Sequence, residues 1–139
     1  MYKRQKSLLP IVIVLAIATA FGFWHNRSRG KVVVKSDKGL ITSAMIGADL
    51  GSRATLLQFS TVFCGPCRAT RLLIEDVTAD MDDVAHVEVD AEANLELVRK
   101  LDIRSTPTTL FLDSRGHEVG RAMGAPKRDQ VLKAISAIA

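Results

Sequence analysis

Two cysteines separated by two residues are the strongest chemical feature of the sequence. Cys64 and Cys67 enclose Gly65 and Pro66, and the chain contains no other cysteine. Two cysteines are too few for a disulfide-dense secreted scaffold or for a four-cysteine zinc site. A pair at this spacing can form a reversible disulfide, bind a metal, or be buried without any chemistry.

The local context of the pair favours redox chemistry. The apolar run at residues 54–60 predicts a buried strand, and apolar positions recur at helical spacing over residues 67–80. Cys64 therefore falls at a helix N-terminus, where unpaired N–H groups and the helix dipole stabilise a thiolate. We expect Cys64 to be the nucleophile and Cys67, one turn further on, to resolve a mixed disulfide.

A metal site is the alternative use of the two cysteines. It needs further ligands, and the three histidines, His25, His86 and His117, do not lie near the cysteines in the sequence. We therefore expect no metal. A static disulfide is a further alternative.

The rest of the chain alternates between strand and helix patterns. The other expected elements are, in chain order, a short strand within residues 31–35, a strand at 84–89, a helix carrying Leu95, Val98 and Leu101 with Asp90 as its cap, hairpin strands at 108–112 and 117–122, and a last helix opened by Pro126. This order implies an α/β fold with a mixed sheet and helices on both faces.

The N-terminal part of the chain has a different character. Seventeen consecutive residues from Leu8 to Trp24 carry no charge. A helix over this run is about 26 Å long, a little short of the roughly 30 Å hydrocarbon core of a bilayer. The sequence therefore predicts a single transmembrane anchor in residues 1–25, a linker over 26–39, and one globular domain over 40–139.

The charge distribution supports this division. Residues 1–38 hold eight basic side chains and one acidic one, whereas residues 39–139 hold eleven basic and fourteen acidic ones, a net charge of −3. A mildly acidic domain argues against binding to nucleic acid. The basic excess flanks the hydrophobic run, where it suits membrane headgroups.

A cleaved signal peptide is the alternative to the anchor. The small residues Ala18, Thr19 and Ala20 resemble a cleavage site, but the apolar run continues beyond them, which favours retention. Basic residues on both sides of the run nearly cancel in the positive-inside rule. The short basic tail resembles an uncleaved signal anchor, so we expect the domain to face outward, with the opposite topology as the alternative.

Two segments resemble the thioredoxin family. Cys64–Cys67 reads Cys-Gly-Pro-Cys, and the segment around Pro107, 40 residues beyond Cys67, resembles the cis-proline segment of that family. The similarity covers about residues 32–139 and implies a thioredoxin-like fold. It also implies that Pro107 lies beside the two sulfurs and that the backbone of Thr106 binds an extended cysteine-containing peptide.

The resemblance extends to the surroundings of the cysteines. It implies a surface that receives the substrate chain, formed by Phe63, Gly65, Pro66, Thr106 and Gly124. Of these, Gly124 resembles the family's glycine before the last helix, which gives a substrate backbone room.

Three departures from the family pattern bear on the chemistry. Phe63 stands where the family usually has Trp, and Gln58 replaces the buried acid six residues before Cys64. Gln cannot accept the proton that the resolving cysteine loses, so either resolution is slower here or water or another group takes the proton. His86 is the candidate base, with a solvated strand histidine as the alternative. The stretch 40–53 is also shorter than the usual first helix, as in membrane-tethered relatives.

The expected function follows from these features. The resemblance implies a thiol–disulfide oxidoreductase that acts on protein disulfides, and the Gly-Pro dipeptide favours a reductase. It needs no bound cofactor, because the cysteines store the electron pair, and its partners are disulfide-containing proteins and an upstream electron donor. We expect a monomer. The alternatives are a scaffold or metal-binding module that uses the Cys pair as ligands and, last, a peroxidase, which would need features around Cys64 that this chain lacks.

Overall fold

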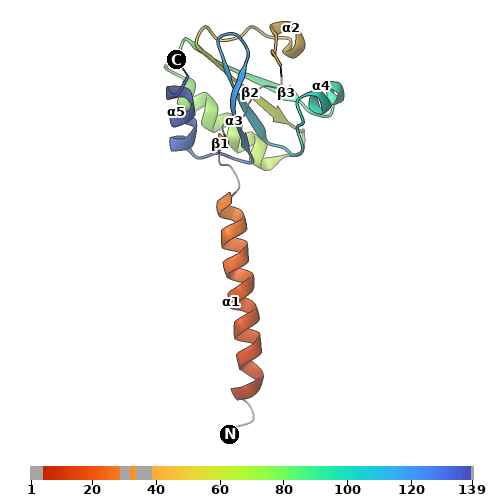
Figure 1. Cartoon of the computed structure of the whole chain (residues 1–139), viewed down its shortest axis with the longest axis vertical. Coiled ribbons are helices and arrows are strands. Elements are labelled where there is room, and N and C mark those ends of the chain that lie inside the picture. Colours follow the sequence, from red (N-terminus) through yellow and green to blue (C-terminus); the bar gives the residue numbers. More distant parts are fainter. Residues whose placement is uncertain (1–4, 29–31, 34–38, 139) are drawn as a thin grey trace.

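The computed structural model describes residues 5–28, 32–33 and 39–138 (Figure 1). Its elements are, in chain order, α1 (Gln5–Ser28), β1 (Val32–Val33), α2 (Ser43–Ile46), β2 (Ala54–Ser60), α3 (Gly65–Thr78), β3 (Val84–Asp90), α4 (Leu95–Lys100), β4 (Thr108–Asp113), β5 (Glu118–Met123) and α5 (Arg128–Ser136). The strands form one sheet in the order β1-β5-β4-β2-β3. β2 runs parallel to β3, and the other neighbouring pairs are antiparallel, so the predicted mixed sheet is confirmed.

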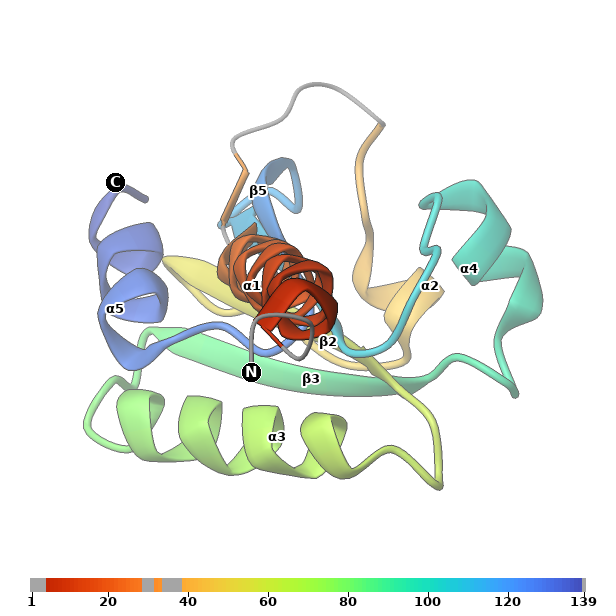
Figure 2. The ribbon, with the colours of Figure 1, turned by 90° about the horizontal axis from the view of Figure 1, so that it is seen from below.

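Apolar side chains cover both faces of the sheet, as the alternation along the strands predicts. On the face of α3 and α5, the buried cluster is Ala54, Leu56, Ile74, Val77, Val84, Phe111, Ala122, Val131, Ile135 and Ile138. On the face of α2 and α4, it is Ile41, Leu57, Phe59, Val89, Leu101, Ile103, Leu110 and Leu112. All seven residues of β2 are buried, and α3 runs alongside β3 (Figure 2). β2 is therefore the centre of the core.

The N-terminal helix α1 extends away from the domain (Figure 1). Its stretch Leu8–His25 has a mean hydropathy of 2.1, and none of it is buried. It is long and apolar enough to cross a membrane, although a signal sequence has the same properties. The helix reaches Ser28, three residues beyond the predicted end of the anchor.

The two helices that flank the predicted site begin at slightly different residues than the sequence predicts. α3 begins at Gly65, two residues early, because Cys64 is its N-cap and the Cys64 sulfur accepts a hydrogen bond from the N–H of Cys67. α5 begins at Arg128, so Pro126 lies just before the helix instead of opening it.

The predicted cap of α4 is wrong. Asp90 does not cap that helix, whose N-cap residue is Asn94. The Asp90 side chain instead accepts the N–H of Glu92 at 2.8 Å, and its carbonyl accepts the Asn94 side-chain amide at 2.9 Å. These local bonds stabilise a turn, so the helix starts one turn later than expected.

A buried ion pair connects β5 to the end of α4. Glu118 and Arg121 are only 8% and 7% exposed, and the Arg121 guanidinium donates to Glu118 at 2.7 Å. The same guanidinium donates to the carbonyl of Leu101 at 3.1 Å. The pair therefore holds the start of the segment that leads from α4 to Pro107.

Replacing Glu118 with Ala is expected to lower the free energy of unfolding by about 3–5 kcal/mol, because the Arg121 charge stays buried without its partner. The measurement is denaturant unfolding of the full chain in detergent. The matched control is Asp76→Ala, which breaks the exposed ion pair between Asp76 and Arg128. That substitution is expected to lower the free energy of unfolding by about 1 kcal/mol or less. Equal losses in the two variants would contradict the prediction.

Candidate active site

The two cysteines lie at the start of α3, joined by a disulfide with an S–S distance of 2.10 Å. Cys64 is half-buried, whereas Cys67 is 2% exposed. The N–H of Cys67 donates a hydrogen bond to the Cys64 sulfur at 3.2 Å. Both this bond and the positive end of the helix dipole stabilise a negative charge on that sulfur. Of the two sulfurs, Cys64 is therefore the one that a partner can reach and the one whose negative charge the helix stabilises.

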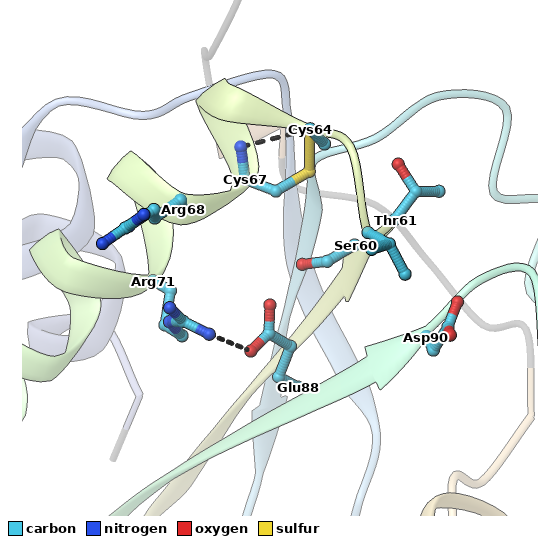
Figure 3. A pocket seen from close by; sticks show the side chains of 9 residues that line it. Ser60, Thr61, Cys64, Cys67, Arg68, Arg71, Glu88 and Asp90 are labelled. Carbon is cyan, nitrogen blue, oxygen red and sulfur yellow. Dashed lines mark hydrogen bonds and ion pairs between the residues drawn. A yellow bond between two sulfur atoms is a disulfide. The ribbon is translucent and has the colours of Figure 1, made fainter.

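A cavity of about 490 Å³ lies beside the disulfide (Figure 3). Both cysteines line it, together with Ser60, Thr61, Val62, Arg68, Arg71, Glu88 and Asp90. Figure 3 shows the Glu88 side chain pointing from β3 toward α3, on the cavity side of the disulfide, where its carboxylate pairs with Arg71 at 3.4 Å. A cavity of this size with polar walls has room for water next to the sulfurs.

Sequence reasoning missed Glu88 as part of the site. The signal was present, because β3 alternates and places His86, Glu88 and Asp90 on one face. The face itself becomes evident only from the register of the parallel pair, in which Gln58 lies opposite Glu88 and Ser60 lies opposite Asp90.

Gln58 is fully buried behind the resolving cysteine and uses both ends of its amide. Its nitrogen donates to the carbonyl of Cys67 at 2.9 Å and to the hydroxyl of Ser60 at 3.0 Å. Its oxygen faces Nε2 of His86 at 3.1 Å. The acceptor carbonyl of Cys67 requires the amide nitrogen on that side, so the oxygen must face His86 and Nε2 of His86 must carry a proton.

The surroundings of His86 favour its neutral form. Burial lowers the pKa of the imidazole, Arg71 lowers it further, and the carboxylates of Glu75 and Glu88 oppose the shift. With Nε2 donating to Gln58, the lone pair of the neutral ring is on Nδ1. His86 therefore contacts the cysteine region through the Gln58 amide.

A second depression, with a volume of about 770 Å³, brings together Pro107 and three of the five predicted substrate-binding residues. It is lined by Pro66, Thr106, Pro107, Gly124, Ala125, Lys127, Asp129 and Gln130, and by Phe23 and Arg27 of α1. We call it the peptide groove. The predicted cis peptide bond between Thr106 and Pro107 is present. Gly124 has φ +87° and donates its N–H to the carbonyl of Pro107 at 2.8 Å, so a positive φ accounts for glycine there.

Two predicted contact residues lie beside the peptide groove without lining it. Phe63 is 98% exposed. A Cβ atom added at Gly65 would meet no atom within 4 Å, so space alone does not require glycine at that position. Their predicted contacts with a substrate remain predictions.

The three histidines do not gather around the cysteines. His117 lies beside Asp113 in the β4–β5 turn at 3.3 Å, and His25 stacks on Phe21 in α1. Among the residues that the structure describes, no group of three or more His, Cys, Asp or Glu side chains is arranged to hold a metal ion. In this structure both sulfurs are engaged in the disulfide.

Comparison with known proteins gives the family. The thioredoxin family model matches residues 45–137, and the chain belongs to the thioredoxin family. Thioredoxin H5 of Oryza sativa is 28% identical over 102 residues, covering 73% of this chain and 75% of that protein. The thioredoxin of Mycolicibacterium smegmatis is 32% identical over 88 residues, covering 61% of this chain and 78% of that protein.

Solved structures agree with the sequence comparison. The thioredoxin of Fasciola hepatica aligns with a TM-score of 0.57 and 27% identity, covering 64% of this chain and 84% of that chain. Thioredoxin NaTrxh of Nicotiana alata aligns with a TM-score of 0.55 and 29% identity, covering 61% of this chain and 72% of that chain. The thioredoxin-like fold expected from the sequence is confirmed. Family membership and the paired cysteines support thiol–disulfide exchange as the general type of reaction.

Proposed function

We propose that the chain reduces disulfides of partner proteins through Cys64 and Cys67. The observation that carries the proposal is the pairing of an accessible sulfur at a helix N-cap with a buried sulfur one turn later. The peptide groove beside this pair offers a place for an extended partner segment at Thr106 and Gly124.

The reaction has two steps that balance in atoms and electrons. The Cys64 thiolate attacks one sulfur of the partner disulfide, which forms a mixed disulfide and releases the other partner sulfur as a thiolate. The Cys67 thiolate then attacks the Cys64 sulfur, which releases the first partner sulfur and forms the disulfide seen here. Two electrons pass from the dithiol to the partner, and the two protons lost by the cysteines balance those taken up by the partner thiolates. An upstream donor of two electrons restores the dithiol.

The second step requires an acceptor for the proton of Cys67. His86 is the base that the sequence suggests, yet its protonated Nε2 faces Gln58, and the amide lies between the ring and the backbone of Cys67. Glu88 and Cys67 line the same cavity, and the Glu88 carboxylate forms an ion pair with Arg71 there. Arg68 and Asp90 also line this cavity. The cavity has room for water between the carboxylate and the thiol, so Glu88 is the better placed acceptor.

We also propose that α1 is retained as a single membrane anchor and that the domain faces outward. The support for retention is the apolar stretch Leu8–His25, which has a mean hydropathy of 2.1 and of which none is buried. A soluble protein rarely exposes so large an apolar surface to water.

Replacing Cys64 with Ser is expected to abolish reduction of a partner disulfide, because no nucleophile reaches it. Replacing Cys67 with Ser is expected to trap a stable mixed disulfide with the partner through Cys64. The measurement combines turnover of a test disulfide with non-reducing electrophoresis of the full chain in detergent. If both variants reduced the test disulfide as fast as the native chain, the proposed mechanism would be wrong.

Replacing Glu88 with Gln is expected to slow the release of the partner from the mixed disulfide at pH 7 on the order of tenfold or more, and to move its pH profile upward. The first attack by Cys64 should change less. Rapid mixing with a fluorescent peptide disulfide measures the two steps separately. Asp90→Asn and His86→Asn are the matched controls. An altered profile in His86→Asn with an unaltered one in Glu88→Gln would assign the proton to His86 instead.

The direction of electron flow is testable by the reduction potential of the Cys64–Cys67 pair. We expect a value near about −270 mV, as for reducing members of this fold, because the Gly-Pro dipeptide matches theirs. Equilibration of the full chain against a thiol buffer, followed by thiol labelling, gives the value. A potential near about −120 mV would instead mean that the chain oxidises its partners.

A further inference from the structure

The redox groups gather at one end of the sheet. Ser60 ends β2 and leads to Cys64, while Thr108, the first residue of β4, follows Pro107. Phe59 is paired with Thr108, and Thr108 is paired with Met123 at the end of β5. This end of the sheet therefore carries the cysteines and the peptide groove together.

The chain also enters the domain at this end. β1 is antiparallel to β5, with Val32 opposite Ala122 and Val33 opposite Arg121. Because antiparallel strands run in opposite directions, the chain that reaches Val32 comes from the side of Met123 and Gly124. The register thus places the attachment of α1 at the end of the sheet that carries the cysteines and the peptide groove, whatever the tilt of the helix.

The connection between α1 and the sheet is short. α1 ends at Ser28 and β1 begins at Val32, so three residues separate them. Fully extended, that connection spans about 14 Å. The apolar stretch of α1 ends at His25, only three residues before the helix end, which adds about 4.5 Å. With about 7 Å more from Val32 to Gly124, the peptide groove stays within roughly 25 Å of the edge of the hydrocarbon core.

The peptide groove is completed by the anchor itself. Phe23 and Arg27 of α1 line it together with Thr106 and Gly124. Figure 1 shows α1 leaving the domain near β1, at the end where the N-terminus of α3 lies. A partner chain in this groove would therefore lie against the part of α1 that meets the membrane surface.

The exposed surface at the same end suits an amphipathic partner. Val62, Phe63 and Met123 are 72%, 98% and 49% exposed. Apolar side chains next to the cysteines, combined with the cation of Arg27, match a segment that lies at a membrane interface, where apolar residues meet anionic headgroups.

We propose that the substrate is a disulfide in another membrane protein, held within roughly 25 Å of the edge of the hydrocarbon core, by the sum of the three lengths above. The proposal rests on the proposed thiol–disulfide function and on retention of α1. The short connection holds the groove at the same height above the membrane as the partner disulfide. It therefore raises the effective concentration of the Cys64–Cys67 pair at that disulfide. Disulfides far above the membrane lie outside the reach of the groove.

The test uses the full chain in bilayer discs, reduced beforehand with dithiothreitol and freed of it, in a single turnover. Its substrates are two single-span model proteins, each with one cystine loop. In one the loop follows the span directly, and in the other a rigid helix of about 27 residues raises it by about 40 Å. We expect the near loop to be reduced at least about tenfold faster.

A longer connection should remove this preference. Inserting 24 flexible Gly-Ser residues between Ser28 and Val32 adds about 27 Å of root-mean-square reach. The matched control carries the same 24 residues ahead of residue 1, on the other side of the membrane, and should keep the preference. Both variants should reduce a small soluble disulfide at the native rate, which shows that the domain is intact.

The outcomes separate this inference from the proposed function. Reduction of the soluble disulfide with equal rates on the near and far loops would overturn the inference alone. Absence of reduction with every substrate would overturn the proposed function and the inference with it. Isolation of the native chain with its N-terminus cut after Ala20, shown by mass spectrometry, would also overturn the inference.

Discussion

The pairing of β2 on both of its sides is the constraint on which the site depends. β2 is parallel to β3 and antiparallel to β4 along its length, and every one of its residues is buried. The pairing of Phe59 with Thr108 brings the cysteine turn and the Thr106–Pro107 peptide together although they are far apart in the chain. A slip of one residue would turn Gln58 to the opposite face and remove its contact with Cys67. The fold thus positions the chemistry through register more than through any single side chain.

Gln58 gives this site a different electrostatic character from one with a buried acid. A neutral amide with all its polar atoms hydrogen-bonded is buried without the free energy that an uncompensated charge would cost. It holds the Cys67 backbone and the His86 ring in place at any pH, because it does not titrate. In the proposed reaction, the proton of the resolving cysteine therefore leaves toward the water-accessible side, where Glu88 and Arg71 line the cavity.

Much of the fold and the core of the site could be predicted from the sequence. The strand 54–60 was predicted with its exact bounds, because an apolar run buried on both faces has a clear signal. The predicted short form of the 40–53 segment corresponds to the four-residue α2. Asp90 was misassigned as a cap because an Asp before a helix pattern serves equally well in a turn. Glu88 was missed since its place in the cavity depends on a strand register that no local pattern contains.

The same register also determines what the proposed membrane anchor could do. An edge strand antiparallel to β5 has to be approached from the Gly124 end, so an N-terminal anchor on this fold meets the domain beside its redox groups. The length of the connection then decides the reach, because each added residue extends it by up to about 3.5 Å. A long connection would let the domain rotate and sample soluble partners at any height. With α1 anchored as proposed, the three residues between Ser28 and Val32 would restrict this range and keep the cysteines close to the membrane surface.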